Sequence, residues 1–141
     1  MMYWDTSALV KLYVEERGSR QVAGWQHDVR ASSVIAYVEM HSALSRRRRS
    51  GHLTMPQFRS AIDQFVADWQ AYVRIPLHSD IIDRAARLVE QHALRTLDAL
   101  HLAAALQLQD DMEAPTKMLS ADGALLAAAA AEGLVIHRIA L

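Results

Sequence analysis

Four carboxylates stand in the sequence where their neighbours are mainly apolar or where a short apolar segment ends. Asp5 directly follows Tyr3 and Trp4, and Asp98 interrupts a run that is otherwise almost free of polar residues. The full set is Asp5, Glu39, Asp98 and Asp122. Hard cations such as Mg²⁺ take oxygen ligands, whereas carboxylates collected without a cation repel and raise one another's pKa. If the fold brings the four together, we expect a bound divalent metal.

Asp98 is the carboxylate that is hardest to explain by structure alone. It lies in Leu97–Leu106, which reads LDALHLAAAL and whose only other polar residue is His101. A helix that is apolar on nearly all sides is normally buried. An ionised carboxylate in such a helix is costly unless it is paired or bound to a metal. The structural alternative is an ion pair with Arg95, three residues earlier.

The other three carboxylates each have an ordinary structural explanation. Asp5 precedes an expected helix and Asp122 lies at the start of another, where an Asp side chain can cap the first backbone N–H groups. Glu39 interrupts the apolar run Val34–Met40, although an exposed Glu near the start of a helix is also common. The metal interpretation therefore depends on all four lying together, not on any one of them.

The elements that must position these side chains alternate between strands and helices. Candidate strands are Met2–Trp4, Val29–Ser32, Val73–Leu77, Lys117–Leu119 and Val135–Arg138. Apolar residues at helical spacing predict helices over Ser7–Glu16, Ser19–Gln26, Val34–Ser50, Pro56–Tyr72, Ser79–His92, Leu97–Leu108 and Ala121–Ala131. This alternation predicts an α/β fold whose mainly parallel sheet is covered on both faces. In such sheets functional groups gather beyond the carboxyl ends of the strands, and Asp5 and Asp122 fall there.

Length and composition narrow the possible classes of protein. The chain has 141 residues, which fits one domain over residues 1–141, and 52% of them are hydrophobic. It contains no cysteine, which excludes disulfides and thiolate zinc sites. We find no secretory signal, and the longest strongly apolar run, Ala124–Ala131, is far shorter than a membrane span. We therefore expect a soluble, cytoplasmic protein.

The cationic residues are mostly arginines, and several of them are clustered in the sequence. Of fifteen, two are lysines and the rest are arginines, which suit bidentate phosphate contacts, although a GC-rich genome gives the same bias. The formal net charge is −1, so bulk charge does not attract a nucleic acid. The strongest local concentration is the run Arg46, Arg47, Arg48 and Arg49. Cations at the end of a helix also suit its macrodipole, so a solvated face is the alternative to a phosphate contact.

Several segments together resemble the PIN-domain ribonucleases, and in particular the VapC-type toxins of VapBC toxin–antitoxin pairs. The opening segment MYWDTSALVKLYVEE and the segment LRTLDALHLAAAL are similar to the first and third acidic motifs of that family. VEMHSAL and LSADGALLAAAAAEGL resemble the second and the closing motifs, which are less specific. The order and spacing fit across essentially the whole chain. The resemblance implies a PIN-like three-layer α/β/α sandwich with a sheet of four to five strands.

The resemblance also implies a function and assigns site residues. It implies an endoribonuclease that depends on Mg²⁺ or Mn²⁺ and hydrolyses RNA phosphodiester bonds. Asp5 and Asp98 would bind metal directly, while Glu39 and Asp122 would bind a second ion or orient water. Ser7 occupies the position of a supporting hydroxyl. The implied partners are an RNA substrate, a cognate antitoxin and a second copy of the chain in a homodimer.

Two residue assignments keep an alternative at this point. His101 lies one helical turn after Asp98 and could support the metal site, but a lone His on an apolar helix is more often a core residue. The run Arg46–Arg49 is a candidate RNA-binding segment or a solvated helix end.

Two other kinds of protein fit parts of the pattern. An aspartyl-phosphate enzyme also has an Asp at a strand end, but a phosphatase of that type needs Asp-x-Asp where this chain has Asp5-Thr6-Ser7, and a receiver domain needs adjacent acidic residues there. A non-catalytic PIN-like module that binds RNA or protein shares the fold without the activity. RNA cleavage that requires Mg²⁺ and stops with EDTA separates an enzyme from such a module.

Overall fold

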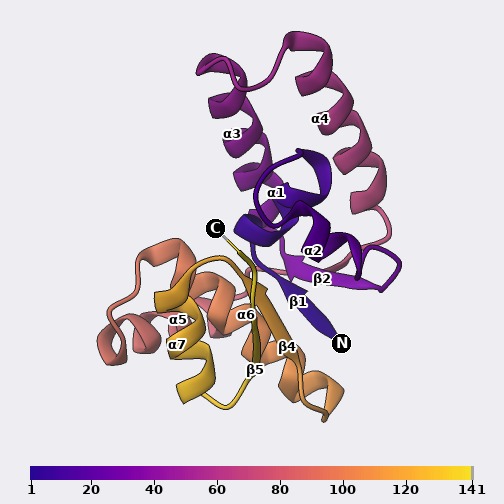
Figure 1. Cartoon of the computed structure of the whole chain (residues 1–141). Coiled ribbons are helices and arrows are strands. Elements are labelled where there is room, and N and C mark those ends of the chain that lie inside the picture. Colours follow the sequence, from indigo (N-terminus) through magenta and orange to yellow (C-terminus); the bar gives the residue numbers. More distant parts are fainter. Residues whose placement is uncertain (141) are drawn as a thin grey trace.

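The computed structural model describes residues 1–140 and contains every strand and helix that the sequence predicts, in the expected order (Figure 1). The strands are β1 (Met2–Trp4), β2 (Arg30–Ser33), β3 (Val73–Ile75), β4 (Lys117–Ser120) and β5 (Val135–Arg138). The helices are α1 (Thr6–Tyr13), α2 (Ser19–Ala23), α3 (Ile35–Arg49), α4 (Met55–Trp69), α5 (Ser79–Gln91), α6 (Thr96–Met112) and α7 (Gly123–Ala131). The predicted α/β class is confirmed.

The five strands form one sheet in the order β3-β2-β1-β4-β5, and every neighbouring pair is parallel. From β1 the chain winds to one side through β2 and β3, and it then crosses to the other side of β1 for β4 and β5. Ligand sites of open α/β sheets lie at such a reversal, beyond the carboxyl ends of the strands. The ends of β1 and β4 are therefore the expected place for a site, and Asp5 and Asp122 follow these two strands.

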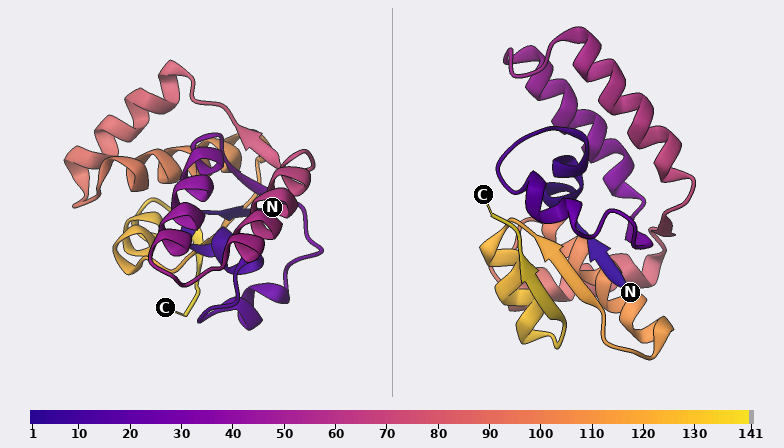
Figure 2. Two further views of the ribbon diagram at one scale, coloured as in Figure 1. Left: turned by 90° about the horizontal axis from the view of Figure 1, so that it is seen from above. Right: turned by 45° about the vertical axis from the view of Figure 1, so that its right-hand side comes forward.

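Helices cover both faces of the sheet, as a parallel sheet requires (Figure 2). Successive residues of β1 point to opposite faces: Tyr3 packs with residues of α5, α6 and α7, and Trp4 packs with residues of α1, α3 and α4. Both side chains are fully buried. Phe58, Phe65 and Trp69 of α4 belong to the second of these cores. The three-layer arrangement agrees with the prediction.

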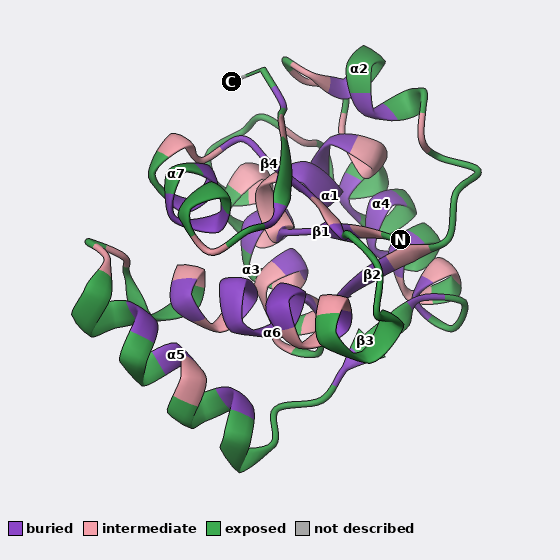
Figure 3. Ribbon diagram, turned by 90° about the horizontal axis from the view of Figure 1, so that it is seen from below, coloured by how far each residue is buried: buried purple, intermediate pink, exposed green. Residues whose placement is uncertain are grey.

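Helix α6 lies closest to the centre of the molecule and is buried over most of its length (Figure 3). Its interior face consists largely of alanines, including Ala99 and Ala103–Ala105, all without exposed surface. Small side chains let the helix approach the sheet closely, and this approach brings the first turns of α6 to the end of β1. Asp98 and His101 are in these turns.

Several helix boundaries differ from the prediction, and for two of them, the ends of α1 and α6, the structure shows a local reason. Helix α1 ends at Tyr13 and not at Glu16, because Val14 adopts an extended conformation and the Ser19 hydroxyl donates a hydrogen bond to the Val14 carbonyl. Helix α6 continues past Leu108 to Met112, since its last polar residues face solvent. It ends where Glu113 takes a left-handed conformation (φ 51°).

Strand β3 ends at Ile75, two residues earlier than predicted, because Pro76 has no N–H to donate to the sheet. Strand β2 is displaced by one residue from its predicted span. Among residues 1–140, no helix combines the length and the apolar character needed to cross a membrane.

Candidate metal and RNA site

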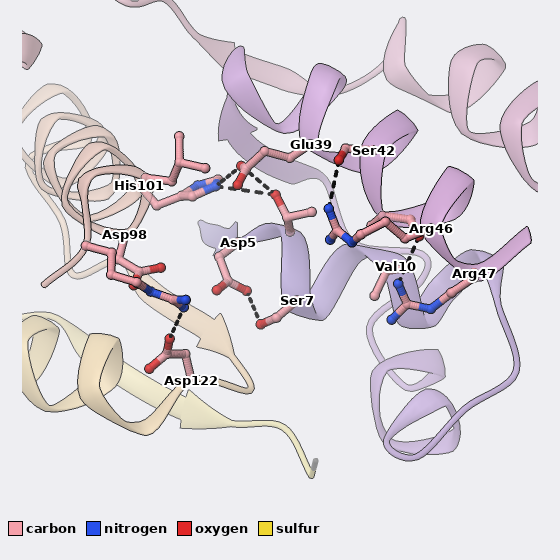
Figure 4. Close-up of a pocket in the computed structure, with 14 residues that line it drawn as sticks. Asp5, Ser7, Val10, Glu39, Ser42, Arg46, Arg47, Asp98, His101 and Asp122 are labelled. Carbon is pink, nitrogen blue, oxygen red and sulfur yellow. Dashed lines mark hydrogen bonds and ion pairs between the residues drawn. The ribbon is translucent and has the colours of Figure 1, made fainter. Parts of the chain in front are cut away.

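The four predicted carboxylates line one pocket of about 370 Å³ at the carboxyl ends of the strands (Figure 4). They come from four parts of the chain: Asp5 follows β1, Glu39 is in α3, Asp98 is in the first turn of α6, and Asp122 follows β4. The structure therefore brings together side chains that are up to 117 positions apart in the sequence. Their catalytic and metal-binding roles remain predictions.

Asp5 is the most buried of the four and is held by three donors. Its Oδ1 accepts hydrogen bonds from the Ser7 hydroxyl at 2.7 Å and from the Ala8 N–H at 3.1 Å, and the Ser120 hydroxyl donates to Oδ2 at 2.7 Å. The bond to Ala8 makes Asp5 the N-cap of α1, so the structural explanation of this residue is confirmed, while its metal-binding role stays a prediction. A carboxylate offers about four acceptor positions, so one remains for an ion.

The two serines that hold Asp5 are themselves fixed to the loop after β4. The Ser7 hydroxyl accepts the Ala121 N–H at 2.9 Å, and the Ser120 hydroxyl accepts the Asp122 N–H at 3.0 Å. Ser7 thus lies where it can hold Asp5, and its supporting role stays a prediction. The ends of β1 and β4 are joined by side chains as well as by the sheet.

Glu39 reaches the pocket from α3 and is bound through one of its oxygens. Its Oε1 accepts the Thr6 hydroxyl at 2.8 Å and lies 2.6 Å from Nε2 of His101. Burial acts to raise the pKa of Glu39, but the hydrogen bond and electrostatic attraction of His101, the hydrogen bond from Thr6 and the charge of Arg46 outweigh it and lower the pKa. Glu39 is therefore held in its ionised form, the form that binds a cation.

Asp98 and Asp122 share a cationic neighbour, Arg95. Nε of Arg95 is 3.4 Å from Oδ2 of Asp98, and one of its terminal nitrogens is 3.7 Å from Oδ2 of Asp122. The ion pair considered as the structural alternative for Asp98 is thus present. However, the Arg95 side chain is 85% exposed, and such surface pairs contribute little to stability. Asp122 also caps α7, where its Oδ1 accepts the Leu125 N–H.

The electrostatics of the pocket fit a bound cation. Burial raises the pKa of Asp5 against the electrostatic attraction of His101 and the hydrogen bonds from Ser120, Ser7 and Ala8. Burial and the charge of Asp122 raise the pKa of Asp98, and Arg95 offsets this in part. Both carboxylates are therefore costly to ionise without an additional positive charge, and oxygen donors of this kind are the ligands that Mg²⁺ takes.

The side chains as they stand are arranged around their protein partners and not around an ion. Within residues 1–140, no group of three or more carboxylate or imidazole side chains is positioned to hold one metal ion. The oxygens are directed instead to Ser7, Ser120, Thr6, His101 and Arg95. Binding an ion requires some of these side chains to change rotamer, and Arg95, being exposed, is the freest to move.

The four arginines at the end of α3 do not form a single surface. Arg46 and Arg47 line the pocket, and Arg46 donates a hydrogen bond to Ser42. Arg47, which Figure 4 shows beside Arg46, is paired with the carboxylate of Glu16 at 3.1 Å. The guanidinium of Arg48 lies 5.4 Å from the ring centre of Phe58. RNA contact stays a prediction for all four, and the geometry supports it for Arg46 and Arg47.

The structure adds three residues to the site that sequence reasoning did not select. Ser120 lies two residues before Asp122 in the segment LSADGALL, and this proximity is the sequence feature that could have identified it. Thr6 follows Asp5, but nothing local indicates that it contacts Glu39. Arg95 was considered as a partner of Asp98, and its contact with Asp122 depends on the fold.

Comparison with known proteins supports the same family as the motifs. The model of the PIN domain family matches residues 2–122. Ribonuclease VapC45 of Mycobacterium tuberculosis is 36% identical over 112 residues, which are 78% of this chain and 78% of that protein. The chain belongs to the PIN domain family, and within it to the VapC group.

Solved structures show the same fold at low sequence identity. FitAcB from Neisseria gonorrhoeae superposes with a TM-score of 0.71 over 96% of each chain, at 13% identity. A toxin–antitoxin complex from Klebsiella pneumoniae gives a TM-score of 0.61 at 16% identity, over 86% of this chain and 87% of that one. The predicted PIN-like fold is confirmed.

Replacing Asp98 by Asn is expected to stabilise the metal-free chain at neutral pH. Because the folded-state pKa of Asp98 is raised, stability is lost as the pH rises from the usual range of an Asp to the raised value, and Asn avoids this loss. One kcal/mol corresponds to roughly 2–4 °C in a chain of this size, so we expect Tm to rise by a few degrees at most. Thermal unfolding in EDTA measures it. The gain should disappear at low pH, where Asp98 is protonated in both states; a lower Tm at pH 7 would contradict it.

Proposed function

We propose that the chain is a Mg²⁺- or Mn²⁺-dependent endoribonuclease and that the pocket described above is its active site. As a member of the VapC group it is a ribonuclease toxin of the toxin–antitoxin type. The observation that carries the assignment of the site is the meeting of four carboxylates, from four separate elements, in one pocket at the reversal point of the sheet.

Each carboxylate has a role that follows from its surroundings. Asp5 and Asp98, whose pKa values are raised, would ligate an ion directly, while Glu39 and Asp122 would ligate a second ion or orient water. The bound ion would offset the repulsion between the acidic pocket and an RNA phosphate and would activate water as the nucleophile. The hydroxyls of Ser7 and Ser120 keep Asp5 in place for this work.

The arginines around the pocket suggest where the RNA backbone lies. Arg46 is at the α3 side of the cavity and Arg95 at the α6 side, so phosphates on either side of the cleaved bond would each meet a guanidinium. Such contacts position the backbone and carry no information about sequence. When an ion binds to Asp98 and Asp122, Arg95 would leave these two carboxylates and pair with an RNA phosphate instead.

The proposed protein partner is a cognate antitoxin that covers this pocket. The similarity to the VapC group and to a chain of a solved toxin–antitoxin complex supports such a partner. A homodimer, one domain over the whole chain and a cytoplasmic location remain predictions.

The test of the function uses the purified protein freed of antitoxin. It should cut structured RNA in the presence of Mg²⁺ or Mn²⁺ and stop when EDTA is added, with activity restored by excess metal. Cleavage that continues unchanged in EDTA would refute the metal-dependent mechanism. RNA binding without cleavage at any metal concentration would favour the non-catalytic module.

A further inference from the structure

A chain of buried hydrogen bonds runs from the core of the molecule to Glu39. Tyr3 of β1 is fully buried, and its hydroxyl oxygen accepts the Ser33 N–H at 3.0 Å. The same hydroxyl lies 2.7 Å from Nδ1 of His101, which is 2% exposed. Nε2 of His101 lies 2.6 Å from Oε1 of Glu39. The chain therefore links β2, β1, α6 and α3.

The hydrogen bonds around His101 favour one position for the proton of its neutral ring. Because the Tyr3 oxygen already accepts the Ser33 N–H, its own proton is available for Nδ1. A ring nitrogen that accepts a hydrogen bond has no proton, so the proton of the neutral ring is on Nε2. From there it is donated to the Glu39 carboxylate.

The consequence for Glu39 is a fixed orientation. The donors from His101 and Thr6 both reach Oε1, and among the hydrogen bonds of residues 1–140 none is made by Oε2. Oε2 is thus the oxygen left for an ion. If the His101 proton were on Nδ1, Nε2 would present a lone pair to the carboxylate and would repel it.

We propose that Tyr3 is a positioning residue, which acts through His101: its hydroxyl selects the Nε2–H form of the imidazole and so holds Glu39 ready to bind metal. This inference rests on the proposed function of the pocket. It also gives His101 a supporting role in place of that of an ordinary core residue. Partners that orient a ligand in this way commonly change metal affinity by 10- to 100-fold when removed.

The decisive measurements are the tautomer of His101 and the affinity for Mn²⁺ in the absence of RNA. Two-dimensional ¹⁵N NMR of the imidazole should show Nε2 protonated and Nδ1 not in the wild-type chain, which needs no substitution. Tyr3→Phe should weaken Mn²⁺ binding, measured by calorimetry, by about 10-fold. A wild-type ring protonated on Nδ1 would overturn the inference.

Tyr72→Phe is the matched control. Tyr72 is also buried, its hydroxyl is hydrogen-bonded to that of Tyr13 at 2.9 Å, and it does not line the pocket. Loss of its hydroxyl should lower stability in the same way as Tyr3→Phe but leave Mn²⁺ affinity unchanged. Equal losses of affinity in the two variants would show a general structural effect and would overturn the inference.

A double substitution tests whether Tyr3 acts through His101. The side-chain amide of His101→Gln can donate to Glu39 without any choice of tautomer, so Tyr3→Phe should change Mn²⁺ affinity less than twofold in that background. A tenfold change there would overturn the inference. Failure of the wild-type chain to bind Mn²⁺ at all would instead refute the proposed function, so the two failures are distinguishable.

Discussion

Asp5→Asn and Asp98→Asn are each expected to reduce metal-dependent RNA cleavage by about 10²- to 10³-fold or more. Asn keeps the size of the side chain but removes the negative charge that the ion requires. Asp5 retains one free acceptor position after its three hydrogen bonds, and in Asn one of its two oxygens becomes an amide nitrogen that cannot ligate a cation. The rate of cleavage of a structured RNA at saturating Mg²⁺ measures the effect.

Asp83→Asn provides the control for the change of charge. Asp83 is exposed on α5, so its substitution should leave the cleavage rate and Mn²⁺ affinity of the chain unchanged. In cells, the wild-type chain expressed without antitoxin should arrest growth, and Asp98→Asn should be harmless. An Asp98→Asn variant that cuts RNA at the parental rate would remove Asp98 from the proposed mechanism.

The sequence was sufficient for the element order because the strands are short and are separated from one another by segments of helical periodicity. The predicted ends of α1 and β3 were wrong because a single residue there overrides the local pattern. Ser19 satisfies the backbone of the turn after α1, and Pro76 interrupts the pairing of β3. Periodicity carries no information on such contacts.

The four carboxylates were selected from the sequence because each is an acidic residue at a strand end or in an apolar helix. Their supporting groups were not all accessible in this way. Tyr3 reads as an ordinary core residue of a strand, and its bond to His101 spans 98 positions. Similarly, the run of four arginines gives no sign that Arg46 and Arg47 face the pocket while Arg48 packs on Phe58. Both facts depend on which side of a helix meets which neighbour.

Lys11, Glu16 and Arg47 form an ion-pair network beside the pocket. Lys11 is buried and pairs with Glu16 at 3.1 Å, and Glu16 binds Arg47 at 3.1 Å. Because Arg47 lines the pocket, the loop that carries Glu16 helps to set the position of this guanidinium. The conformation of that loop depends on Gly18.

Gly18→Ala is expected to destabilise the chain by about 2–5 kcal/mol, which combines roughly 1–2 kcal/mol for a left-handed residue and 1–3 kcal/mol for overpacking. Gly18 has φ of 92°, and a Cβ there would lie 2.8 Å from the Ala140 carbonyl oxygen and 2.9 Å from Cδ of Lys11. Relief of these contacts has to move either the C-terminal residues or Lys11, and with Lys11 its partner Glu16. Urea denaturation measures the loss.

Gly133→Ala separates the two contributions. Gly133 has φ of 95°, close to that of Gly18, but nothing lies within 4 Å of the position of its Cβ. It should therefore cost about 1–2 kcal/mol, the conformational part alone. Equal losses in the two variants would mean that the contacts of Gly18 contribute nothing. If they do contribute, Gly18→Ala should also weaken RNA binding through Arg47, whereas Gly133→Ala should not.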